Sequence, residues 1–174
     1  MLNPVPRVCR TTQETGGRRQ PTQGRISNAA NSGAWDEFGS GDRTRCGTAN
    51  SGALLAVAVA AVHVADQGGV TALADPAWIG WGYRLIEVGG VLTALILLLP
   101  RPAWLGPAWL GWAAGALLGV APFLGYVATR TVGVPGDSAD VGNWGDWLGT
   151  VSLLVEAALV MLSVSILVAM RQRR

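Results

Sequence analysis

The sequence predicts an all-α membrane protein, in which a four-transmembrane-helix bundle follows a disordered N-terminal tail. Half of the 174 residues are hydrophobic and only 14% are charged, whereas soluble domains carry about 25% charged residues. Residues 1–50 hold seven arginines and four acidic residues, so the hydrophobic character is concentrated in the rest of the chain. That part contains four charge-poor stretches of membrane-spanning length. This composition argues against a soluble enzyme.

Residues 1–45 form the predicted tail. They mix Pro, Gly, Ser, Thr, Gln and Asn with few aliphatic residues and show no helical or strand period. Such a segment cannot bury enough apolar surface to offset its conformational entropy, which predicts disorder. The pair Arg18-Arg19 lies too far before the first apolar stretch for a twin-arginine export signal. Cys9 and Cys46 stay reduced if the tail is cytoplasmic, so no disulfide framework is predicted.

Four stretches are long enough to cross the hydrocarbon core of a bilayer, which needs about 20 apolar residues. They are residues 46–65, 77–99, 103–127 and 147–170. The first is the weakest, because its first third is poorly apolar. The second follows Asp75-Pro76, a pair typical of a helix N-cap and first helical position.

An alternative concerns the first stretch. Ala72-Leu73-Ala74 matches the small-residue pattern of a signal-peptide cleavage site downstream of a short apolar region. Cleavage there would leave three membrane spans instead of four.

Arginine placement predicts the orientation, because cytoplasmic loops are enriched in basic residues. The C-terminus ends in Arg171, Arg173 and Arg174, and the turn between the second and third spans contains Arg101. The loop at 66–75 has no arginine, and the loop at 130–146 has one arginine and three aspartates. These charges predict a multi-pass plasma-membrane protein with cytoplasmic N- and C-termini.

Small residues predict where helices approach closely. Gly111, Gly115 and Gly119 recur at a spacing of four on the third span, as in a glycine zipper, and would let another backbone come near. That neighbour is either another helix of the bundle or a second copy of the chain. A stripe on the fourth span is also expected to face the bundle interior, and it consists of Gly149, Ser152, Glu156 and Ser163.

Charged side chains inside a membrane are costly and often functional. Glu156 lies nine residues after Trp147, about 13 Å deep by helix rise. With the predicted topology, six ionisable residues share the outer half of the bundle: His63, Asp66, Arg84, Glu87, Arg130 and Glu156.

Two interpretations of these six residues remain open. Arg84 or Arg130 could form buried ion pairs with Glu87 or Glu156 that only set helix register. Alternatively, the residues form an outward-facing polar cavity for a cation, a proton or a small ligand, with His63, Glu87 and Glu156 as binding groups.

The sequence predicts no cofactor. One histidine and two cysteines are too few for a self-contained zinc or iron–sulfur site, and bis-histidine haem ligation is impossible within one chain. Residues Val134-Pro135-Gly136-Asp137 predict a turn. Asp137, Asp140 and Asp146 are spaced differently from the ligands of a calcium loop. The sequence therefore identifies no metal ligands. The chain contains no catalytic motif, so neither an enzyme nor catalytic residues are predicted.

The segment after the third span carries a resemblance. Residues 129–135 (TRTVGVP), followed by Val141-Gly142-Asn143-Trp144 and a fourth span with an embedded acid, resemble small four-helix integral membrane proteins of actinobacteria. Those proteins tend to carry a histidine late in the first span, which His63 matches. The resemblance covers about residues 50–170 and excludes the tail. It implies a four-helix membrane protein but no established activity or cofactor.

Two functional hypotheses follow. In the first, the protein is a structural or accessory membrane component without enzymatic activity. In the second, it is a small transporter or a cation- or proton-responsive protein that uses the outer polar cluster. Its expected partners are the lipid bilayer and a second copy or another membrane protein, and a net charge of +2 suggests no nucleic acid.

Overall fold

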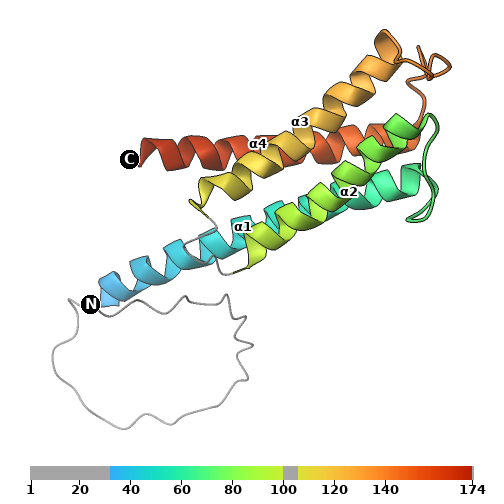
Figure 1. The fold of residues 1–174 in the computed structure, drawn as a ribbon. Helices are drawn as coiled ribbons and strands as arrows, with labels where there is room; N and C mark the ends of the chain where they lie inside the picture. The colour runs from blue at the N-terminus through green and yellow to red at the C-terminus, as the bar shows by residue number, and fades with distance from the viewer. Residues whose placement is uncertain (1–31, 100–105, 174) are drawn as a thin grey trace, which may run out of the picture. The chain divides into compact units, whose positions relative to one another are not determined.

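The computed structural model describes residues 32–99 and 106–173, with side chains from residue 47 onward, and forms four α-helices without strands there (Figure 1). The helices are α1 (Ser32–Asp66), α2 (Ala77–Leu98), α3 (Trp109–Thr131) and α4 (Trp147–Gln172). The chain divides into two units, residues 1–48 and 49–174. The packing described below belongs entirely to the second unit.

The four-helix prediction is confirmed. Each helix contains a segment long and apolar enough to cross a membrane, of 20, 22, 23 and 26 residues in chain order. The first of these segments is Gly47–Asp66, yet α1 itself begins at Ser32. Residues 32–45, expected to lack secondary structure, therefore continue the helix, because extending an existing helix needs no new nucleation. The rest of the predicted tail lies outside the described residues.

Helix boundaries differ from prediction where local backbone chemistry intervenes. The third helix begins at Trp109 rather than residue 103, because Gly106 has a positive φ of 78° and is followed by Pro107. It runs past residue 127 to Thr131 and ends before Gly133, whose φ is 73° and whose N–H donates to the Ala128 carbonyl. The predicted turn around Arg101 lies outside the described residues.

The cap predicted for the second helix is absent, whereas the fourth helix has a cap that was not predicted. Pro76, rather than Asp75, occupies the N-cap position of α2, and no side chain caps that helix. The Asp75 prediction was wrong because the helix starts one residue later than an aspartate cap requires. Asp146 does cap α4, where its carboxylate accepts a hydrogen bond from the Leu148 N–H at 3.1 Å.

Small residues bring the helices together. A Cβ added to Gly90 on α2 would lie 2.7 Å from the Ala56 carbonyl oxygen of α1. A Cβ added to Gly119 on α3 would lie 2.8 Å from the Glu156 carbonyl oxygen of α4. The glycine stripe on α3 is buried at all three positions, so it accommodates a close helix crossing within the chain. The stripe predicted on α4 is likewise buried.

The outer surfaces of the helices are apolar. One leucine on each helix, Leu54, Leu85, Leu117 and Leu154, is between 67% and 75% exposed. The core is built mainly from small residues of α1 and α2, together with Leu118 and Leu159. Four apolar helices with leucines on their outer surfaces indicate a multi-pass membrane protein.

Two loops meet at one end of the bundle, which we call the loop end (Figure 1). The Trp78 indole N–H of α2 donates to the Pro135 carbonyl at 3.2 Å. The α3–α4 loop turns as predicted, since the Asp137 N–H donates to the Val134 carbonyl at 3.0 Å and Gly136 has a φ of 87°. The α3–α4 loop is therefore fixed to the start of α2 at the loop end, where the ionisable residues of the bundle lie.

Candidate functional site

A cavity of about 440 Å³ lies at the loop end, lined by residues of all four helices and of the α3–α4 loop. Most of its lining is apolar, with a limited set of polar groups, as is typical of small-molecule sites. These polar side chains are His63, Asp66, Tyr83, Tyr126, Thr129, Arg130, Asp137, Asp140, Ser152 and Glu156.

Glu156 is the most deeply buried acid of this cavity. Its residue is 1% exposed, and Oε1 accepts a hydrogen bond from the Ser152 hydroxyl one helical turn earlier. The second oxygen, Oε2, is buried and has no hydrogen-bond partner among the described residues. A buried carboxylate oxygen without a partner costs free energy, and a proton on Glu156 or a donor from a bound molecule would remove that cost.

His63 faces Glu156 from α1. Its Nδ1 lies 2.9 Å from the Val59 carbonyl oxygen, which assigns the ring proton of a neutral imidazole to Nδ1. Its Nε2 lies 3.7 Å from Glu156 Oε1. In that tautomer two acceptors face each other. A proton on His63, a proton on the Glu156 carboxyl or a donor from a bound molecule would join them.

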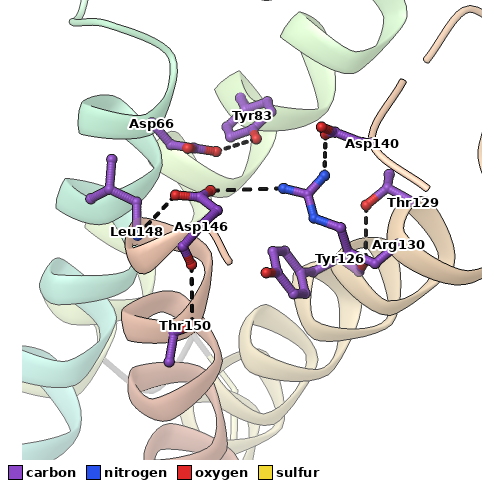
Figure 2. A network of polar contacts seen from close by, with 9 residues as sticks. All are labelled: Asp66, Tyr83, Tyr126, Thr129, Arg130, Asp140, Asp146, Leu148 and Thr150. Atoms are coloured by element: carbon purple, nitrogen blue, oxygen red, sulfur yellow. Dashed lines mark hydrogen bonds and ion pairs between the residues drawn. The ribbon is translucent and has the colours of Figure 1, made fainter. Parts of the chain in front are cut away.

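Arg130 is held by the α3–α4 loop. Its guanidinium forms ion pairs with Asp140 and, at 3.7 Å, with Asp146, while its side chain is only 7% exposed. The guanidinium also lies 4.8 Å from the centroid of the Tyr126 ring. Figure 2 shows both carboxylates converging on the guanidinium beside this ring. The charge of Arg130 is therefore compensated by its own loop.

Asp66 and Tyr83 complete the rim of the site. The Tyr83 hydroxyl of α2 donates to the Asp66 carboxylate of α1, as Figure 2 shows. The Tyr83 ring lies 5.4 Å from the His63 ring, centroid to centroid, in a tilted arrangement. An aromatic ring thus adjoins both Asp66 and His63 at the cavity.

Acidic side chains outnumber basic ones in the lining of the cavity. Four acids line the cavity, namely Asp66, Asp137, Asp140 and Glu156, against the cation Arg130 and the titratable His63. Because Asp146 also pairs with Arg130, the guanidinium does not offset the remaining acids. This balance favours a positively charged occupant.

The six ionisable residues predicted as one cluster divide into two groups. His63, Asp66, Arg130 and Glu156 line the cavity. Arg84 and Glu87 do not: they form an ion pair at 2.6 Å, and they hold the α1–α2 loop.

The contacts of this second pair are local. The Gln67 amide donates to Glu87 at 2.6 Å, and Arg84 donates to the Ala72 carbonyl. Of the predicted ion pairs, the one between Arg84 and Glu87 is present. Arg130 pairs instead with the loop aspartates.

Six polar residues of the site were not predicted as site residues, namely Tyr83, Tyr126, Thr129, Asp137, Asp140 and Ser152. A tyrosine near a span end is usually an interfacial anchor, so sequence position alone did not separate Tyr83 and Tyr126 from ordinary anchors. Ser152 was expected on the inward stripe of α4, four residues before Glu156. That helical spacing was the signal for its hydrogen bond to the carboxylate.

In the part of the chain that the structure describes, no three histidine, cysteine or acidic residues are grouped so that they could hold a metal ion. No protein-family model, curated protein or solved structure matches this chain. The chemistry of the cavity is therefore the basis for a functional proposal.

Proposed function

We propose that this multi-pass membrane protein binds a small organic cation in the cavity at the loop end. The observation that carries this proposal is the unpartnered Oε2 of buried Glu156, which lines the cavity. An ammonium group supplies up to three N–H donors and one positive charge. It can therefore satisfy Glu156 and bridge to His63 Nε2 at the same time.

The rest of the cavity suits the same ligand class. The rings of Tyr83 and Tyr126 line it, and aromatic faces attract cations at short range. The acids that remain after Arg130 is paired add a favourable electrostatic potential. The mostly apolar lining accommodates the organic part of the ligand.

Neutralising Glu156 is expected to abolish most of this binding. Glu156→Gln keeps the size and the hydrogen bond to Ser152 but removes the charge, so the affinity for n-butylammonium should fall at least tenfold, since a hydrogen bond to a charged group is worth about 1.5–3 kcal/mol. Isothermal titration calorimetry of the protein in lipid nanodiscs measures the change. Asp75→Asn is the matched control, because Asp75 is exposed and does not line the cavity.

Two results would contradict the proposal. One is equal affinity of the Glu156→Gln variant and the unmodified protein. The other is no detectable binding of n-butylammonium to the unmodified protein. Thermal unfolding followed by tryptophan fluorescence establishes that the variants are folded.

We further propose that the loop end faces the outside of the plasma membrane and that both termini are cytoplasmic, on the strength of the arginine distribution. Single cysteines introduced as Ser138→Cys or Gln172→Cys, in a background with Cys9→Ser and Cys46→Ser, test this orientation on intact cells. An impermeant maleimide is expected to label position 138 and not position 172. The reverse pattern would place the cavity on the cytoplasmic side.

The second candidate function is a structural or accessory role. It is favoured by the pairing of Arg84 with Glu87 and of Arg130 with the loop aspartates, because paired charges fix helix positions without any ligand. If the protein has this role, Glu156→Gln changes its stability or assembly, and neither the variant nor the unmodified protein binds n-butylammonium.

A further inference from the structure

A second, apolar cavity adjoins the polar one. It is a groove of about 310 Å³ between α2 and α3, and no charged side chain lines it. Leu85, Ile86, Ala121 and Pro122 line both this groove and the polar cavity. The two spaces are therefore adjacent and share a wall.

The groove is open to the lipid-facing surface. Leu85 and Leu117, which line it, are 75% and 68% exposed. Along α2 the groove extends from Leu85 to Thr93, about 12 Å by helix rise. A molecule in the groove would thus contact the bilayer along its side, with one end next to the residues that also line the polar cavity.

Small residues create this space. Gly89 on α2 and Ala114 on α3 line the groove, and a Cβ added to Gly89 would make only an ordinary contact of 3.5 Å with Leu118. At the crossing of α3 with α4, by contrast, a Cβ at Gly119 would collide with backbone. The glycine of the groove leaves room rather than bringing two backbones together.

We infer that the ligand is a single-chain amphiphilic amine, with its ammonium group at Glu156 in the polar cavity and its alkyl chain in the groove between α2 and α3. This inference rests on the proposed function and adds the ligand class and a lateral route from the bilayer. The charge arrangement selects a cationic head, and the uncharged groove selects an apolar tail. A polar group on the tail would be left without partners there.

The test measures how blocking the groove changes the binding of a short amine and of a long amine. Gly89→Leu fills the groove from its α2 wall, and Ala61→Leu, at an exposed position of α1 outside both cavities, adds comparable bulk as a control. Binding of n-butylammonium and n-dodecylammonium is measured in nanodiscs. Gly89→Leu is expected to weaken the long amine at least tenfold and the short amine less than twofold, while Ala61→Leu changes neither.

Photocrosslinking gives a second measurement on the unmodified protein. A dodecylamine carrying a diazirine at the end of its chain is expected to label peptides of α2 and α3 around Thr93 and Ala114, and excess n-butylammonium should compete with it. Labelling spread over the lipid-facing surfaces of all four helices would overturn the inference.

The two proposals fail in different ways. If Glu156→Gln lowers butylammonium affinity but Gly89→Leu affects both amines equally or neither, the cation site stands and the amphiphile inference is wrong. If neither amine depends on Glu156, the proposed function itself is wrong.

Discussion

Replacing both Asp140 and Asp146 with asparagine is expected to lower the free energy of unfolding by about 3 kcal/mol, because it leaves a buried guanidinium without a counter-charge. Arg130 is 7% exposed and pairs with both carboxylates. Asp146 also caps α4, but asparagine is an equally good N-cap residue. The expected loss of stability is therefore caused by removing the negative charges and not by removing the helix cap. Chemical unfolding in mixed detergent micelles, followed by tryptophan fluorescence, measures it.

Combining the two substitutions with Arg130→Met provides the decisive control. Removing the guanidinium also removes the buried charge, so the triple variant should regain at least half of the lost stability, as an apolar replacement of a buried ion pair often does. Asp137→Asn is the matched single control, because Asp137 lines the same cavity without pairing with Arg130. A triple variant less stable than the double variant would show that Arg130 acts through packing on Tyr126 rather than through charge.

Replacing Gly119 with alanine is expected to destabilise the fold by about 1–3 kcal/mol, the usual cost of overpacking a close contact. The added methyl group would lie 2.8 Å from the Glu156 carbonyl oxygen and 2.7 Å from a Val160 methyl group. The first of these atoms is helix backbone and cannot turn away as a flexible side chain can. Helix α4 must therefore shift, and with it the carboxylate of Glu156. The same unfolding assay measures the effect.

Gly125→Ala on the same helix is the matched comparison. A Cβ at Gly125 has no atom within 4 Å, so alanine there should be neutral or stabilising by up to about 1 kcal/mol through its better helix propensity. Equal effects at the two positions would mean that helix propensity, and not the crossing with α4, governs both substitutions.

Much of the fold could be predicted from the sequence. The four spans follow from runs of apolar residues about as long as the bilayer is thick. The inward stripe of α4 follows from the spacing of Ser152, Glu156 and Ser163, all three of which are buried. The start of α3 was predicted too early, because the proline and the glycine with positive φ just before Trp109 outweigh the apolar character of that stretch.

The candidate site was predicted only in part. Depth along each helix follows from counting residues, so the ionisable groups could be placed towards one end of the bundle. The face of the helix on which each side chain lies was harder to predict, because neighbouring positions differ by about 100° around the helix axis. Tyr83 lines the cavity, whereas the next residue, Arg84, pairs with Glu87 and the α1–α2 loop.

The sequence alone predicts four helices that are apolar enough to cross a membrane, and it places Glu156 deep within the fourth. Both are properties of one helix in a bilayer, where apolar length and the cost of charge act segment by segment. Three further features appear only in the folded chain: Glu156 faces His63, Arg130 pairs with the loop aspartates, and an apolar groove adjoins the polar cavity. These features depend on the rotation and crossing of helices far apart in the chain, which are set by mutual packing of side chains.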